Sequence, residues 1–312
     1  MTLSEINMRK ITFLLLLFGN YFSTFSQTNM QDSTVQVVGY WNNGEKQSYT
    51  ISENKYKVQN GDTIDREKLT YEVDITIQDS TSDSYTIEWE YKNIVVESAN
   101  EMLKKIMSYS RLKKATFKTD QFGAFKELLN WKEIRDDISK MIMPMKEEFK
   151  NLPNFDKILD QHLSMFSTKE SIESTAIQEI QQFYTFHGGK YDINKTIETK
   201  TNLPNIYGGT PFDADLTIWV QEVNVDDSNF TLCMEQKVDS IQLHTAVYDY
   251  LSKLSTNIGT TIPKSEKLSS LRNTIWTTSM VHDSGWPIYT ILTKEIVAED
   301  VQKVQELLIE LK

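Results

Sequence analysis

The stretch LTYEVDITI, residues 69–77, alternates strictly between apolar and polar side chains. A period of two residues is typical of an antiparallel β-strand that has one face in the core and the other in water. The stretch YTIEWEY, residues 85–91, repeats this pattern after a polar turn at 78–84. Together the two stretches predict a β-hairpin with one apolar face, and they make an antiparallel sheet the basis of the fold.

Alternating stretches recur along the chain and are separated by turn signals. The clearest turns are Asn42-Asn43-Gly44 and Asn60-Gly61-Asp62, because asparagine and glycine accept the backbone angles of tight turns. The chain therefore predicts further strands. They are expected at residues 35–40, 46–58, 114–118, 124–129, 216–220, 230–234, 274–281 and 286–293.

Apolar residues recur at helical spacing in the segments between these strands. Ser98 and Glu101 have the spacing of a capping box, which predicts a helix that begins there. Pro144 is expected to kink or interrupt a second helix that begins near Trp131. The expected helices after the first cover residues 131–149, 155–166, 168–187, 240–254 and 301–311.

The order of these elements is the same in both halves of the chain. Each half has a turn, a long strand, a hairpin, a helix, a second hairpin and a final helix. Gly123 and Gly285 lie in the second hairpins, and Lys-Glu-Ile begins nine residues after each of them. The sequence therefore predicts an α+β fold of internally duplicated antiparallel sheet units, each with helices on one face. The expected parts are a first repeat at 27–150, a helical connector at 151–187 and a second repeat at 188–312.

The N-terminus has the pattern of a secretory signal peptide. Met8-Arg9-Lys10 is a short basic start, an apolar run follows at 11–18, and small residues precede a cleavage site after Ser26. The apolar stretch is interrupted and is shorter than the roughly 20 residues that span a bilayer. We therefore expect residues 1–26 to be a signal peptide and the protein to be exported to the periplasm or the medium. Translation could start at Met1 or at Met8.

Charge and cysteine content exclude several classes of partner. The net charge is −11, which disfavours nucleic acids and anionic membrane surfaces, since both bind through basic patches. Cys233 is the single cysteine, so the fold contains no internal disulfide. The acidic charge is therefore interpreted as a source of solubility.

No catalytic or metal-binding pattern emerges, and we expect no cofactor. His282-Asp283-Ser284-Gly285 contains the residue types of a hydrolytic triad, but neighbours in a tight turn do not converge as a triad requires. Glu88 and Glu90 flank Trp89 and share one strand face, so a hydrolase is an alternative. The polar face of a half-buried sheet explains the same pattern more simply.

The methionines Met141, Met143, Met145 and Met165 are the candidate ligand-binding residues, because flexible thioether side chains adapt to varied apolar surfaces. Filling of the core is the competing interpretation. The sequence favours a non-catalytic exported bacterial protein that binds a hydrophobic small molecule or partner segment in an apolar groove. The layout is similar to that of periplasmic lipid carriers at the level of fold alone. An envelope-associated module that binds another protein is the alternative.

Overall fold

A computed structural model describes residues 27–99, 101, 104, 112–148, 160, 163, 166–205, 207, 209–258 and 271–312. The predicted signal peptide at 1–26 lies outside these residues, as does most of the helix expected at 155–166. Within the described part of the chain, no helix is both long and apolar enough to cross a membrane.

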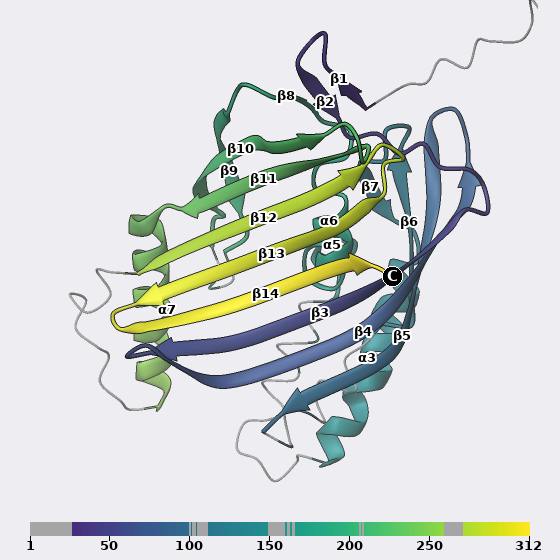
Figure 1. The fold of residues 1–312 in the computed structure, drawn as a ribbon. Helices are drawn as coiled ribbons and strands as arrows, with labels where there is room; N and C mark the ends of the chain where they lie inside the picture. Colours follow the sequence, from purple (N-terminus) through teal and green to yellow (C-terminus); the bar gives the residue numbers. More distant parts are fainter. Residues whose placement is uncertain are drawn as a thin grey trace, which may run out of the picture.

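The main feature is one antiparallel sheet with eleven strands, in the order β7-β6-β5-β4-β3-β14-β13-β12-β11-β10-β9 (Figure 1). Strand β14 pairs with β3, so the last strand of the chain joins its two halves. A small second sheet lies at one end of the large one and contains β1 (Thr28–Asn29), β2 (Thr34–Gln36) and β8 (Lys190–Asp192). The strands of the large sheet are β3 (Lys46–Gln59), β4 (Asp62–Ser80), β5 (Ser84–Ser98), β6 (Lys114–Asp120), β7 (Phe125–Leu128), β9 (Ile197–Leu203), β10 (Phe212–Asn224), β11 (Asn229–Val238), β12 (Arg272–His282), β13 (Pro287–Ala298) and β14 (Val301–Leu311).

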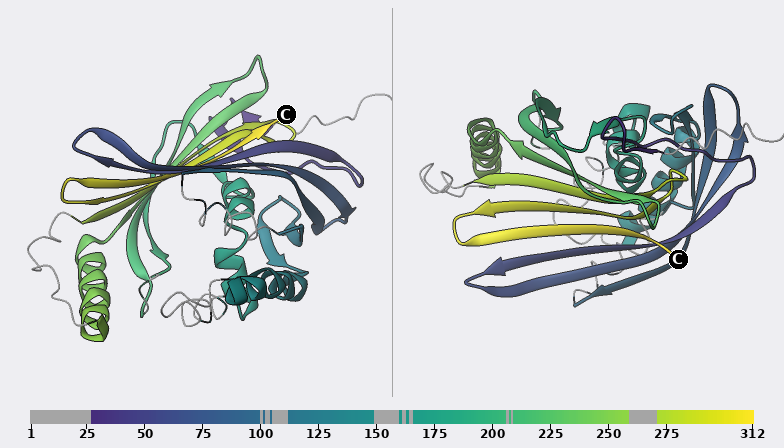
Figure 2. Two further views of the ribbon diagram at one scale, coloured as in Figure 1. Left: turned by 90° about the horizontal axis from the view of Figure 1, so that it is seen from below. Right: turned by 45° about the horizontal axis from the view of Figure 1, so that its top comes forward.

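The helices lie on one side of this curved sheet (Figure 2). Helices α3 (Trp131–Glu148) and α5 (Lys169–Thr175) lie towards the end formed by the first half of the chain, and α6 (Gln178–Phe183) lies against β13 and β14 near the centre of the sheet. Helix α7 (Ser240–Ile258) lies at the opposite end. We call the side that carries the helices the inner face of the sheet and the opposite side the outer face.

The largest core lies on the inner face of strands β3 to β6, where α6 packs. Alternate residues of these strands, such as Ile51, Val73 and Ile87, are completely buried there. The side-chain amide of Gln182 on α6 donates hydrogen bonds to the backbone oxygens of Leu307, at 2.9 Å, and Thr290, at 3.3 Å. These bonds anchor α6 to the centre of the sheet, because its buried amide donor finds acceptors only there among the described residues.

The prediction of a final helix at 301–311 was wrong, because this segment forms strand β14. It pairs along its whole length with β13 on one side and β3 on the other. The apolar residues Leu307 and Ile309 alternate onto the inner face and are buried there. Pairing with two neighbours and burial on a shared face therefore outweigh the helical spacing of the other apolar residues.

The expected helix at 168–187 is also different in the structure, because α5 and α6 are two short helices with Ala176 and Ile177 between them. In contrast, the helix predicted from Trp131 is confirmed and runs through Pro144. Strand β5 continues as far as Ser98, where a helix was predicted to begin, and the described residues Glu101 and Lys104 beyond it are helical.

The α+β prediction is confirmed only in a coarser form, since the chain is mostly β, with a large antiparallel sheet and a few helices. The internal duplication is not confirmed. The first Lys-Glu-Ile, at 132–134, lies in α3, whereas the second, at 294–296, lies in β13. That sequence match therefore does not mark equivalent positions. Both expected repeats contribute strands to one sheet, and the boundaries near 150 and 187 stay a prediction.

Candidate ligand-binding site

Several apolar residues on the inner face of β10 to β13 are only partly buried. The register places inner-face residues of neighbouring strands in a row that crosses β10 to β14. Three of its members, Ile218, Met234 and Leu292, remain partly exposed, and where the row continues onto β3 to β5 only the position on β4 is completely buried. We call this row the apolar row, and it contains Ile218, Met234, Thr277, Leu292 and Leu307.

Packed residues border the apolar row. At one end, α6 packs on the core that includes Leu307. At the other end, Ile218 and Met234 pack against a second buried core. Helix α7 packs farther along the strands, against residues that include Ile296. Between these contacts the buried hydroxyl Oγ1 of Thr277 has no hydrogen-bond partner within the described part of the chain. The row is therefore mostly apolar, with one buried hydroxyl that no described residue bonds.

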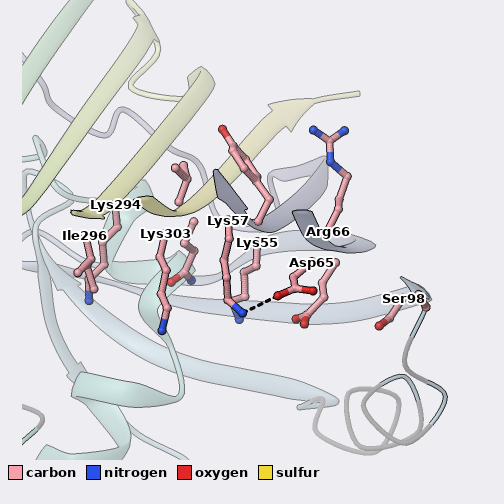
Figure 3. Close-up of a pocket in the computed structure, with 13 residues that line it drawn as sticks. Lys55, Lys57, Asp65, Arg66, Ser98, Lys294, Ile296 and Lys303 are labelled. Atoms are coloured by element: carbon pink, nitrogen blue, oxygen red, sulfur yellow. Dashed lines mark hydrogen bonds and ion pairs between the residues drawn. The ribbon is translucent and has the colours of Figure 1, made fainter. Parts of the chain in front are cut away.

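A cavity of about 680 Å³ lies beside the apolar row, at the ends of β3, β4, β13 and β14. On β13, the inner-face residues run from Leu292 in the row to Lys294 and Ile296 in the cavity wall. Figure 3 shows four lysines of the cavity wall pointing to the same side of the sheet, whereas Arg66 points to the other side. These lysines are Lys55, Lys57, Lys294 and Lys303, and we call them the lysine cluster.

Only two members of the lysine cluster have a carboxylate partner among the described residues. Lys57 forms an ion pair with Asp65 at 2.5 Å, and Lys55 forms one with Glu53 at 2.8 Å. No ion pair to a described residue is formed by Lys294 or Lys303. Burial lowers the pKa of the Lys294 ammonium group, because the charged form loses part of its hydration. The cavity wall therefore includes two amino groups that no described carboxylate pairs with.

The predicted methionine site is not brought together at this cavity. Met145 is buried, Met141 packs partly against the core of the first half, and Met143 is 59% exposed. Met165 lies outside the described residues. None of the three described methionines lines the cavity, and a role for them in ligand binding stays a prediction.

Sequence reasoning did not identify the lysine cluster. A signal for it was present, because Lys294 occupies a position between Leu292 and Ile296 at which the alternating pattern predicts an apolar residue. Lys55 and Lys57 have the same spacing of two on another strand. Only the pairing of β13, β14 and β3 shows that these residues meet.

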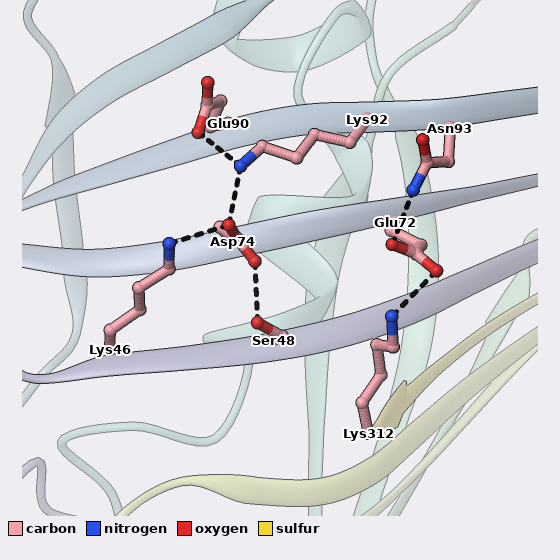
Figure 4. Close-up of polar contacts among 8 residues, drawn as sticks. All are labelled: Lys46, Ser48, Glu72, Asp74, Glu90, Lys92, Asn93 and Lys312. Atoms are coloured by element: carbon pink, nitrogen blue, oxygen red, sulfur yellow. Dashed lines mark hydrogen bonds and ion pairs between the residues drawn. The ribbon is translucent and has the colours of Figure 1, made fainter.

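The carboxylates of the hydrolase alternative lie on the outer face of the sheet, away from the cavity. Glu88 forms an ion pair with Lys114 at 2.9 Å, and Glu90 forms one with Lys92 at 2.8 Å. Lys92 also contacts Asp74, and hydrogen bonds from Lys46 and Lys92 hold the pKa of Asp74 well below its usual range (Figure 4). These contacts make both glutamates part of a solvated polar surface.

The segment at 282–285 is a tight turn, as predicted. The backbone N–H of Gly285 donates to the carbonyl oxygen of His282 at 2.8 Å, and the N–H of Ser284 donates to His282 Nδ1 at 3.1 Å. Within the described residues, no group of three histidine, cysteine or acidic side chains could hold a metal ion.

Comparisons with known proteins identify no family for this chain. No family model matches it, and no curated protein matches it. Among solved structures, it is similar to a chain described under lipid–protein interactions in lipovitellin, with a TM-score of 0.41 and 10% identity over 87% of this chain and 25% of that one. The chain thus spans about a quarter of that lipovitellin chain.

A second similar structure is an exported protein with a YmcC-like fold from Bacteroides fragilis, with a TM-score of 0.22 and 8% identity over 89% of this chain and 99% of that one. A third is DynF from the dynemicin biosynthesis pathway of Micromonospora chersina, with a TM-score of 0.19 and 6% identity over 94% of this chain and 92% of that one. Similarity at this level carries no functional conclusion.

Proposed function

We propose that this protein is a non-catalytic carrier that holds a hydrophobic ligand on the inner face of β10 to β13, between α6 and α7. The observation that supports the proposal is the partial exposure of three apolar side chains of the apolar row, Ile218, Met234 and Leu292, on the inner face of the sheet. Apolar surface left in water forgoes about 25 cal/mol per Å² of burial free energy. A hydrophobic ligand on the row would recover that free energy.

The adjoining cavity has a suitable size. Its volume of about 680 Å³ lies within the roughly 300–1,000 Å³ that is usual for small-molecule sites. Export is part of the same proposal, because a carrier shields a hydrophobic molecule from water between cell compartments. Its support is the signal-like pattern of residues 1–26.

A pair of matched substitutions on β13 tests this function. Leu292 lies on the inner face in the apolar row, and its neighbour Ile291 lies on the outer face of the same strand. Leu292→Asn is expected to weaken binding of the neutral fluorescent probe N-phenyl-1-naphthylamine by about tenfold, because it places an amide where the probe needs apolar contact. Ile291→Asn is expected to change the affinity less than about twofold. It introduces the same loss of β-propensity into the strand, but its side chain does not contact the ligand.

The measurement is a fluorescence titration of the full chain and both variants, with circular dichroism to verify the fold. Equal loss of probe affinity in the two variants would contradict the proposal, since it would show that probe binding does not depend specifically on the inner face. Absence of probe binding to the unaltered protein would contradict it as well.

A further inference from the structure

We propose that the ligand is a single-chain amphiphile with an anionic head group, which binds Lys294 and Lys303 while its chain lies on the apolar row. This inference rests on the proposed function and adds the chemical class of the ligand. The head group is a carboxylate or a phosphate monoester, since both present several acceptor oxygens to ammonium donors.

The register brings the two lysines within reach of one anion. Lys294 lies opposite Gln305, and Lys303 lies opposite Ile296, so the two lysines are diagonal neighbours on β13 and β14. Diagonal neighbours on one face have Cα atoms about 7–8 Å apart, and long side chains bridge that separation. Figure 3 shows both side chains directed to the inner side of the sheet.

The lysine cluster brings like charges close together. Lys57 lies directly opposite Lys303 on β3, and like charges at such positions destabilise a sheet. Asp65 and Glu53 pair with Lys57 and Lys55, and Glu67 also lines the wall without an ion pair to a described residue. Lys294 and Lys303 nevertheless have no carboxylate within 4 Å among the described residues. A ligand anion would neutralise them in a chain whose net charge is otherwise −11.

The apolar neighbours of Lys294 set the direction of the chain. Lys294 is only partly exposed, and its nearest inner-face neighbours on β13 are Leu292 and Ile296. Ile275 lies directly opposite Lys294 on β12 and is also partly exposed. A head group at Lys294 therefore places its hydrocarbon chain on Ile275 and Leu292, and from there along the apolar row.

The test compares ligands with one chain length and different head groups. Laurate, dodecyl phosphate and dodecanol each compete with N-phenyl-1-naphthylamine for the full-length protein, below their aggregation concentrations. Laurate or dodecyl phosphate is expected to bind at least tenfold more tightly than dodecanol, and the stronger of the two identifies the head group. Inorganic phosphate alone is expected to displace neither laurate nor dodecyl phosphate, because most of the binding free energy comes from the hydrocarbon chain of the ligand.

Substitution of the lysines separates the head-group contact from the chain contact. Lys294→Met and Lys303→Met are each expected to weaken binding of the anionic ligand by about fivefold to tenfold, with little effect on dodecanol. Lys237→Met is the matched control, because Lys237 on the outer face of β11 pairs with Glu235 at 2.8 Å, away from the cavity. The control is expected to bind all three ligands like the unaltered protein.

The outcomes distinguish this inference from the proposed function. Equal affinity for laurate, dodecyl phosphate and dodecanol would overturn the anionic head group and leave the carrier function intact. Displacement by inorganic phosphate as effective as that by dodecyl phosphate would overturn the amphiphile in favour of a simple anion site. Failure of every chain-bearing ligand and of the probe to bind would refute the carrier function itself.

Discussion

Replacing Gly285 with alanine is expected to lower the free energy of unfolding by about 3 kcal/mol or more, from a left-handed backbone penalty of about 1–2 kcal/mol and an overlap cost of similar or larger size. Gly285 has a φ of +85°. An added Cβ would overlap the carbonyl oxygen of Val38 and lie 2.8 Å from the Cα of Gly39. Both neighbours are backbone atoms, so no side-chain rotation relieves the overlap.

The backbone at Val38 and Gly39 has little freedom to move away. The N–H of Gly39 donates to the carbonyl of Phe122 at 3.0 Å, and the N–H of Tyr40 donates to that of Ser284 at 3.3 Å. The hydroxyl of Tyr85 donates to the Gly39 carbonyl at 2.8 Å. The segment is therefore bonded to both hairpin turns and to β5, and a shift at Gly39 would break several of these bonds.

Gly44 provides the matched control. Its φ is +80°, and an added Cβ would meet no atom within 4 Å. Gly44→Ala is therefore expected to cost only the conformational penalty of about 1 kcal/mol. Urea unfolding followed by tryptophan fluorescence measures both variants. A similar decrease in the free energy of unfolding of the two variants would show that the contact with Val38 does not matter to stability.

The second large effect is a loss of stability between pH 6.5 and pH 4 that comes from His187. Its ring is 6% exposed and lies against Trp41 and Tyr184, with ring centroids 5.6 and 5.0 Å away. Burial lowers its pKa to about 4, although the Gly285 carbonyl and the charge of Asp120 act in the opposite direction. The neutral ring is therefore the form that the fold accommodates.

The hydrogen bonds of His187 agree with a neutral ring. Nε2 lies 2.8 Å from the carbonyl oxygen of Gly285, so this nitrogen carries the proton and donates it. Nδ1 is buried and has no hydrogen-bond partner among the described residues. A second proton on Nδ1 would place an unsatisfied charge in the core.

The sign of the effect follows from proton binding. Between pH 6.5 and about 4 the unfolded chain binds one more proton at His187 than the folded chain does, so acidification favours unfolding. Each pKa unit corresponds to about 1.4 kcal/mol, which gives roughly 3 kcal/mol of lost stability at pH 4. Carboxylates with a lowered pKa, such as Asp74, contribute a separate loss that begins at about pH 5 and grows mainly below about pH 4.

Denaturant unfolding of the unaltered protein and of His187→Phe at several pH values measures this contribution. Phenylalanine keeps an aromatic ring beside Trp41 and Tyr184 but cannot bind a proton, so the slope of the free energy of unfolding against pH between 6.5 and 4 is expected to flatten. The slope is the informative quantity, since loss of the bond to Gly285 lowers the stability of the variant at every pH. If the slope of the free energy of unfolding against pH is unchanged in the variant, groups other than His187 cause the loss of stability in acid.

Much of the sheet could be predicted from the sequence, because local alternation reflects a local property. The stretches at 69–77 and 85–91 lie in β4 and β5 and bury the predicted faces. The segment at 301–311 could not be predicted in the same way, because its neighbours β13 and β3 make it a strand. The pairing with β3 joins residues about 250 positions apart and leaves no local pattern.

The candidate site was harder to predict from the sequence than the fold. The flexible side chains of the methionines led to a predicted ligand site on helix α3, whereas the structure has a cavity at the ends of four strands. Lysines at alternating positions on a strand usually point to solvent, so Lys55, Lys57 and Lys294 taken singly do not indicate a binding site. They become a candidate site only through the order of β13, β14 and β3, which depends on long-range pairing.

The measurement that tests the carrier function most directly is native mass spectrometry of the protein purified without detergent from a bacterial periplasm. A bound amphiphile is expected as a reproducible additional mass that disappears on denaturation, and organic extraction then identifies its head group. In Leu292→Asn this additional mass is expected to be reduced, and in Ile291→Asn it is expected to remain. A clean apoprotein mass that persists after incubation with laurate, dodecyl phosphate and dodecanol would contradict the proposed function.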